Sequence, residues 1–235
     1  MTQLIALVTG ASQGIGKEIA RQLAEVGLTV YVGSRTADRA EEAATDIGVN
    51  ARPLVVDVTD AASVAAAAKQ IEALDVLVNN AGVSPAEGRP AQDENADTFR
   101  AVFDTNVFGV VTVTNAFLPA LRHAARPRIV NISSGTGSLA LATGDMAKYQ
   151  GAYASYRASK TALNALTVLY AQSLASDGIK VNSLAPGLRR TGLNAAAANG
   201  GDPSEAAAAA VRLALSPDDT ITGTFINWDD TALPW

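Results

Sequence analysis

Thr9-Gly10-Ala11-Ser12-Gln13-Gly14-Ile15-Gly16 stands between a short apolar run and an amphipathic stretch, so it joins a predicted strand to a predicted helix. Its glycines follow the spacing GxxxGxG. Glycine permits a sharp turn and a close approach to the backbone, and a helix N-terminus offers free N–H groups to an anion. The stretch therefore predicts a phosphate-binding loop; an ordinary tight turn between a strand and a helix is the alternative interpretation.

The rest of the chain repeats the order of strand and helix. Apolar runs predict strands buried on both faces at Leu4–Thr9, Thr29–Gly33, Leu54–Asp57, Leu74–Asn79, Arg128–Ser133 and Lys180–Leu184, with a last strand at Gly223–Trp228. Amphipathic patterns predict helices near residues 15–26, 37–47, 60–72, 97–123 and 153–176. This alternation predicts an α/β fold: a doubly wound parallel sheet of about seven strands with helices on both faces.

The pattern contains no interdomain linker, so residues 1–235 are predicted to form a single domain. Residues 192–204, rich in glycine, alanine and asparagine, are the candidate for a mobile substrate loop. Alanine tracts at 65–68, 195–198 and 206–210 indicate packing through small side chains in helices or loops.

Composition excludes several classes of function. The chain has no cysteine and one histidine, His123, which excludes thiol chemistry and makes a histidine-based metal site or a serine–histidine triad implausible. A net charge of −5 argues against binding to nucleic acid or to an anionic membrane. No signal-peptide pattern and no membrane-length apolar run is found, so we expect a cytoplasmic protein.

Further motifs follow the glycine-rich loop in order along the chain. They are Asp57-Val58, Asn79-Asn80-Ala81-Gly82, Asn106, Ser134, Tyr156-Arg157-Ala158-Ser159-Lys160, and Pro186-Gly187 with Thr191. Each is weak alone, but in this order and with TGxxxGxG the chain resembles the short-chain dehydrogenase/reductase family over nearly its whole length. The resemblance implies a Rossmann-type fold and reversible hydride transfer between a nicotinamide cofactor and a carbonyl or secondary alcohol.

Tyr156 and Lys160 are four residues apart in a predicted helix, so they share one face. A lysine ammonium about 5 Å from the tyrosine would favour the phenolate by roughly 3 kcal/mol, which lowers the tyrosine pKa by about two. The pair thus predicts a general acid/base. An isolated YxxxK would more often be a buried tyrosine and a lysine that extends to solvent.

The resemblance assigns further roles. It implies that Lys160 also binds the nicotinamide ribose, that Ser134 orients the substrate oxygen, and that Asn106 belongs to a proton relay. Tyr153 is interpreted as a pocket or core residue, because the residue four positions after it is Arg157. Ser133 and Ser134 are adjacent on an extended segment, so only one of them can face the cofactor, and the family pattern favours Ser134.

The second predicted strand ends at Ser34 and Arg35, where relatives that prefer NAD usually carry an acid. A guanidinium can bind a 2′-phosphate, whereas an acid would repel it, so we expect NADP(H), with NAD(H) as the weaker alternative. The predicted cofactor-binding residues are Gly10, Ser12, Gln13, Gly14, Ile15, Gly16, Ser34, Arg35, Asp57, Val58, Asn79, Ala81, Gly82, Tyr156, Lys160, Pro186, Gly187 and Thr191.

The chain departs from the family between Ser134 and Tyr156, which are 22 positions apart, whereas about a dozen is common in the family. The extra residues, near Ala142–Gly151, resemble the insertion of the carbonyl-reductase-like branch. We expect them at the pocket rim or beside the long helices, with turns at Gly144 and Gly151 and apolar surface from Met146 and Tyr149. In that place they would bias assembly away from a tetramer, toward a homodimer or a monomer.

The sequence therefore predicts an NADP(H)-dependent carbonyl reductase acting on a small carbonyl or alcohol substrate. Two other interpretations were weighed. A cofactor-sensing protein without catalysis would usually lack the tyrosine or the lysine, and both are present. A sugar-nucleotide epimerase or dehydratase would have a longer C-terminal substrate domain and a GxxGxxG loop.

Overall fold

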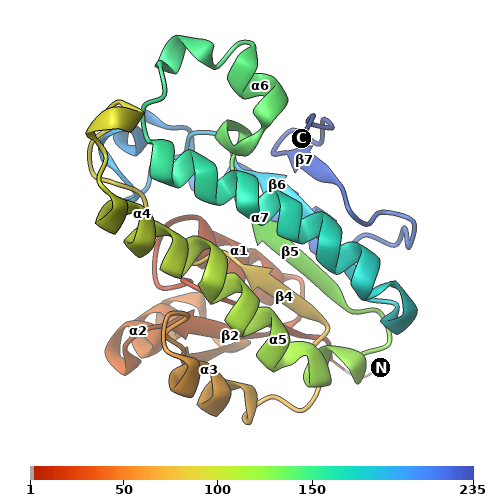
Figure 1. Ribbon diagram of the computed structural model, residues 1–235. Helices are drawn as coiled ribbons and strands as arrows, with labels where there is room; N and C mark the ends of the chain where they lie inside the picture. Colours follow the sequence, from red (N-terminus) through yellow and green to blue (C-terminus); the bar gives the residue numbers. More distant parts are fainter. Residues whose placement is uncertain (1–2) are drawn as a thin grey trace.

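Seven parallel strands form one sheet in the order β3-β2-β1-β4-β5-β6-β7, as the computed structural model of residues 3–235 shows (Figure 1). The strands are β1 (Ile5–Val8), β2 (Thr29–Ser34), β3 (Ala51–Val55), β4 (Val76–Asn79), β5 (Arg128–Ile132), β6 (Lys180–Ala185) and β7 (Phe225–Asn227). The predicted Rossmann-type α/β fold is confirmed. Of the predicted domain 1–235, residues 1 and 2 lie outside the described residues.

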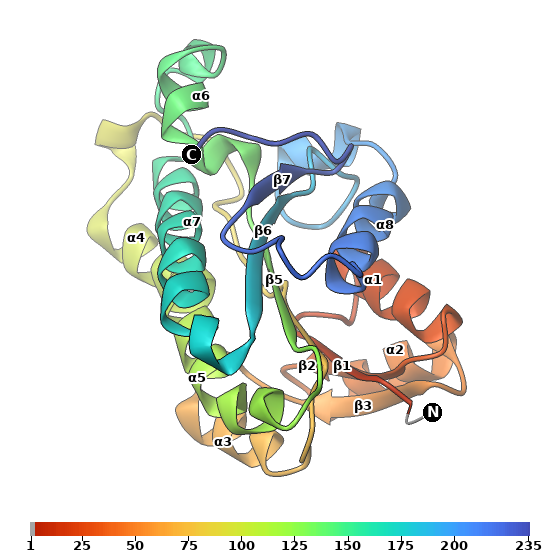
Figure 2. The same ribbon diagram turned by 90° about the vertical axis from the view of Figure 1, so that its right-hand side faces the viewer.

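Helices cover both faces of the sheet (Figure 2). On one face lie α1 (Gly14–Glu25), α2 (Ala37–Ile47) and α8 (Pro203–Ala214). On the other lie α3 (Ala61–Ala68), α5 (Gly109–Arg122) and α7 (Ala154–Ser173), with α4 (Ala96–Phe103) leading into α5. The short α6 (Leu139–Thr143) stands at one end of the molecule.

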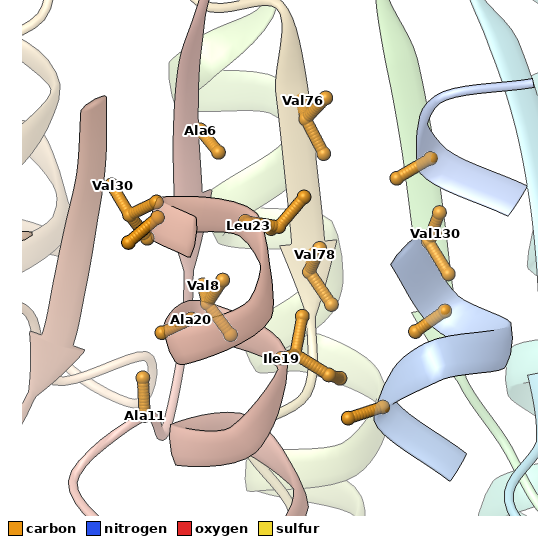
Figure 3. Close-up of a cluster of buried hydrophobic side chains, with 14 of the residues drawn as sticks. Ala6, Val8, Ala11, Ile19, Ala20, Leu23, Val30, Val76, Val78 and Val130 are labelled. Atoms are coloured by element: carbon orange, nitrogen blue, oxygen red, sulfur yellow. The ribbon is translucent and has the colours of Figure 1, made fainter. Parts of the chain in front are cut away.

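The alternation of side chains along the strands divides the interior into two cores. Ala6 and Val8 of β1 join the core under α1, α2 and α8, whereas Leu7 between them joins the core under α3, α5 and α7. Figure 3 shows the first core, where Ile19 and Leu23 of α1 lie over the strands. The alanine tract at 206–210 is helical, and its small buried side chains let α8 pack closely beside α1.

The third predicted strand, Leu54–Asp57, is displaced: β3 spans Ala51–Val55. It is one of the two edge strands of the sheet, and Arg52, Pro53 and Val55 are exposed, so it is not buried on both faces. An edge strand tolerates a proline, which cannot donate a ladder hydrogen bond. The first residues of β3 are not an apolar run, so the sequence did not predict where this strand begins.

The long helix predicted at 97–123 is interrupted by a π-helical turn, Asp104–Phe108, between α4 and α5. Over the described residues, the helical segment Ala96–Arg122, which includes this turn, passes a test of length and mean hydropathy for crossing a bilayer, although it contains no unbroken apolar run of that length. A core helix passes the same test of length and composition. Val113, Phe117 and Leu121 of this helix are buried against the sheet.

The strand order reverses between β1 and β4, and the carboxyl ends of parallel strands at such a switch point border a ligand crevice. β1 runs into the glycine-rich loop, β4 into Asn80-Ala81-Gly82, and β5 into Ser133 and Ser134. The fold therefore collects the motifs of the sequence at one edge of the sheet.

Candidate active site

A cavity of about 790 Å³ opens at this edge, and the glycine-rich loop forms one of its walls. Gly10 and Gly14 have φ values of +62° and +59°, which glycine adopts without strain. Gln13 precedes α1 without a side-chain cap, and the first turn of α1 carries no acid. The helix N-terminus thus presents uncapped N–H groups to the cavity, as a pyrophosphate requires.

Asn80 holds this loop in place, although the sequence did not single it out as a site residue. Its amide nitrogen donates to the carbonyl oxygens of Thr9 at 2.9 Å and of Gly10 at 3.1 Å. A Cβ at Gly16 would lie 2.3 Å from the same nitrogen, so only glycine fits there. The second asparagine of Asn79-Asn80 is therefore the one that shapes the phosphate loop.

The cavity extends past the end of β2, where two arginines line it. Arg35, which precedes α2, was predicted there; Arg39, in the first turn of α2, was not. Ser34 and Asp57 also line this part. Asp57 accepts hydrogen bonds from the amide and the hydroxyl of Thr59, so its carboxylate is held in place.

Tyr156 and Lys160 line the opposite part of the cavity, both on α7. The Lys160 Nζ lies 5.7 Å from the centre of the Tyr156 ring and donates a hydrogen bond to the Ile132 carbonyl at 2.8 Å. An ammonium group has three N–H donors, so two of them remain for other hydrogen-bond acceptors.

Burial dominates the acid–base properties of this pair. It raises the pKa of Tyr156 to about 12, an effect that the neighbouring Ser134 hydroxyl partly offsets, and it lowers the pKa of Lys160 to about 8. The expected fall in the tyrosine pKa is therefore not found. The sequence argument treated the pair as partly solvated, whereas desolvation here disfavours both charged forms.

The two adjacent serines point in different directions, as their alternation predicted. The Ser133 hydroxyl is buried and donates to Asn164 Oδ1 at 2.7 Å. The Ser134 hydroxyl lies 2.8 Å from the Thr136 hydroxyl, and it is the polar neighbour that lowers the pKa of Tyr156. Ser134 therefore faces Tyr156, but the cavity lining of residues 3–235 includes Ser133 and not Ser134.

Asn106 sits in the π-helical turn with its side chain buried rather than on the cavity wall. Its Oδ1 accepts from the Val83 amide at 2.8 Å, and its Nδ2 donates to the Val83 carbonyl and to Ser159 Oγ, each at 2.9 Å. Asn106 thus ties the segment after β4 to α7, next to Lys160. π-Helical turns of this kind frequently occur at functional sites.

Two predicted cofactor residues do not line the cavity. The Asn79 side chain points into the core, where it donates to Thr114 and Asn131, because it alternates with Asn80 at the strand end. Gly187, with φ +69°, packs against Trp228 instead. All the other predicted cofactor residues line the cavity.

Among the lining residues that were not assigned to the cofactor site, Asn80 and Ser133 stand in or beside quoted motifs and Gly192 and Leu193 in the predicted substrate loop, whereas the others belong to no short motif. These further residues complete the lining. They are Thr36, Arg39, Val56, Thr59, Asn80, Val83, Ser84, Thr105, Ile132, Ser133, Gly192 and Leu193. Part of the predicted mobile loop, 192–204, is ordered into a short helical turn, Ala195–Asn199, and α8 begins at Pro203. The buried Arg189 anchors this loop through Glu205 and through its position over the Trp228 ring.

The inserted residues between Ser134 and Tyr156 form α6 and an exposed turn, Ala147–Tyr149. Met146 reaches back to the Ser134 loop, since a Cβ at Gly135 would lie 3.5 Å from its methyl group. The cavity lining found among residues 3–235 includes none of 142–151. Gly151 makes a left-handed turn as expected, but Gly144 has φ −108°, and Gln150 and Tyr153 adopt left-handed conformations instead.

Tyr153 directly precedes α7, and its ring packs against Gly88, which lies in the segment between β4 and α4. The cavity lining of residues 3–235 does not include it. This placement fits a packing residue and leaves Tyr156 as the tyrosine beside Ser134 and Lys160.

Comparisons with known proteins agree with this geometry. The family model for short chain dehydrogenase matches residues 4–200. The chain is 38% identical over 208 residues to the short-chain dehydrogenase anuI of Penicillium roqueforti, covering 81% of each. It is also similar to an NADPH-bound carbonyl reductase from chicken fatty liver (TM-score 0.85, 27% identity, 100% of each chain covered).

A third similar structure is the 3-ketoacyl-(acyl-carrier-protein) reductase from Brucella melitensis complexed with NADH. Its TM-score is 0.84 at 26% identity, and the match covers 95% of this chain and 96% of that one. The glycine-rich loop, the strands β1 to β6 and the Tyr156–Lys160 pair lie within the stretch that the family model matches. The chain belongs to the short-chain dehydrogenase family of oxidoreductases.

Proposed function

We propose that this protein is an NADP(H)-dependent carbonyl reductase that reversibly converts a ketone or aldehyde into an alcohol. The observation that carries the proposal is that Tyr156, beside Ser134 and close to Lys160, shares one cavity with an uncapped helix N-terminus. A nicotinamide cofactor held there would supply the hydride for reduction or accept it in oxidation.

The side chains then divide the remaining work. Ser134 donates a hydrogen bond to the substrate oxygen, and Tyr156 gives that oxygen its proton as the alcohol forms. Lys160 stabilises the resulting phenolate. It binds the nicotinamide ribose through the N–H groups that do not donate to the Ile132 carbonyl. Asn106 supports the proton relay by holding Val83 and Ser159 beside Lys160.

The preference for NADP(H) is supported by the two arginines at the far end of the cavity. Arg35 and Arg39 both line it next to Ser34, and the stretch from Ser34 to Arg39 contains one acid, the exposed Asp38, which does not line the cavity. Guanidinium groups bind phosphate oxygens in a fork geometry. Of the two solved structures compared above, one carries NADPH and the other NADH, so the proposed preference rests on these side chains.

The test of the proposed function is a panel of ketones and aldehydes assayed with NADPH and with NADH. Consumption of NADPH with at least one carbonyl substrate is expected. Tight binding of NADPH without turnover on any carbonyl or alcohol would instead favour a cofactor-sensing protein.

Arg35→Asp is expected to shift the ratio of catalytic efficiencies with NADPH and NADH toward NADH by at least about tenfold, or roughly 1.4 kcal/mol. The physical reason is that an acid repels the 2′-phosphate, whereas the guanidinium binds it. Arg100→Asp, an identical change of charge at an exposed residue outside the cavity, should leave the ratio unchanged. An unaltered ratio in Arg35→Asp would show that Arg35 does not contact the 2′-phosphate.

Carbonyl reduction is expected to decline as the pH rises through about 8, where the buried Lys160 loses its charge. Tyr156, with a pKa near 12, keeps its proton over the same range, so the acid itself is not lost. The check is kcat/KM for the carbonyl between pH 6 and 10 with saturating NADPH. A rate that stays constant up to pH 10 would contradict the role given to Lys160.

A further inference from the structure

The Ser134 hydroxyl has three polar neighbours. It lies 2.8 Å from the Thr136 hydroxyl, it accepts from the Thr136 amide at 3.2 Å, and it neighbours Tyr156, whose pKa it lowers. Over residues 3–235, Ser134 is the one side-chain partner found for the Thr136 hydroxyl. Thr136 carries none of the family motifs, and its side chain does not line the cavity.

A hydroxyl group has one proton to donate and two lone pairs that accept. When Thr136 donates from both its amide and its hydroxyl, both lone pairs of Ser134 are used. The Ser134 proton then has one direction left, toward Tyr156 and the substrate oxygen beside it. Negative charge on either oxygen favours this arrangement over the reverse one, in which Ser134 would donate to Thr136.

The turn that carries Thr136 is fixed to the catalytic helix. Thr136 is the middle residue of a helical turn, Gly135–Gly137, and a Cβ at Gly137 would lie 2.8 Å from the backbone of Lys160. Thr161 of α7 donates to the Gly137 carbonyl at 2.9 Å. Thr136 therefore keeps its place relative to Tyr156 and Lys160 independently of the exposed insertion that follows.

We propose that Thr136 is a positioning residue that directs the Ser134 proton toward the reacting oxygen. This inference rests on the proposed function, since it concerns the same site. It adds a hydroxyl chain, Thr136 to Ser134 to the reacting oxygen, in which each hydrogen bond polarises the next. No bond other than hydrogen bonds is made or broken by Thr136.

The test compares Thr136→Val, which keeps the shape of the side chain, with Thr136→Ser, which keeps the hydroxyl. Thr136→Val is expected to lower kcat for carbonyl reduction by about three- to tenfold, the effect of one neutral hydrogen bond, with NADPH binding unchanged. Thr136→Ser should remain within about twofold of the wild type. Thr143→Val, at an exposed threonine of α6, is the matched control and should not change kcat.

A pH profile separates positioning from a purely structural role. In alcohol oxidation, Thr136→Val should move the rise in kcat/KM that reports Tyr156 ionisation to higher pH, because Ser134 then stabilises the phenolate less. Wild-type kcat and pH profile in Thr136→Val would overturn the inference, as would equal losses in Thr136→Val and Thr136→Ser. Failure of the wild type itself to reduce any carbonyl would instead refute the proposed function.

Discussion

Tyr156→Phe is expected to retain NADPH binding and to lose about 10²- to 10⁴-fold in kcat, the usual contribution of a positioned general acid. The substitution removes the hydroxyl that faces Ser134 and leaves the ring against the cavity wall, so the cofactor site keeps its shape. Fluorescence titration with NADPH and steady-state rates with an accepted carbonyl measure the two quantities separately.

Tyr153→Phe is the matched control, because it removes the same group from a tyrosine three residues earlier. Its ring packs against Gly88 outside the cavity lining, so kcat should change little. Turnover near the wild-type rate in Tyr156→Phe would refute the assigned chemistry. A large loss confined to Tyr153→Phe would mean that the other tyrosine is the acid.

The sequence predicted the central sheet well, because five of its strands are buried on both faces and read as apolar runs of the right length. The edge strand β3 was displaced, since its exposed Arg52 and Pro53 break the apolar pattern that marks a central strand. The helix α8 was indicated only by its alanine tract. Its buried face consists of small side chains, and these contribute to the core only because α1 packs close to them.

The motifs predicted the site correctly only where a motif determines how the backbone of its own residues lies. Strand alternation and the glycine spacing predicted how the phosphate loop and the serine pair lie. The sequence could not predict the contacts between residues that belong to different helices, strands and loops. Asn80 rather than Asn79 supports the loop, and Thr136 meets Ser134 only because the chain turns after β5. Arg39, in the first turn of α2, joins Arg35, which precedes that helix, at the cavity. The direction of the Tyr156 pKa was also missed, because burial cannot be read from a spacing of four residues.

Lys160→Met is expected to abolish most of the activity and, at the same time, to stabilise the fold at pH 7. Burial lowers the lysine pKa from 10.5 to about 8, and each unit corresponds to about 1.4 kcal/mol, so the buried charge costs about 3 kcal/mol. Methionine has a similar length and no charge, but it leaves the Ile132 carbonyl without its partner, a loss of about 1 kcal/mol. The net gain is about 2 kcal/mol, which raises Tm by roughly 4–8 °C in a chain of this size.

The pH dependence identifies the origin of this gain. A lysine whose pKa is lowered in the folded state destabilises the fold fully below pH 8, and the penalty fades as the pH rises toward 10.5, where the unfolded chain also loses the proton. The difference in Tm between Lys160→Met and the wild type should therefore be largest at pH 7 and small at pH 10.5. Lys69→Met, at an exposed lysine after α3, should show no such dependence. If Lys160→Met were less stable than the wild type at pH 7, the surroundings of the ammonium would stabilise its charge. The charge beside Tyr156 would then not lower the stability of the fold.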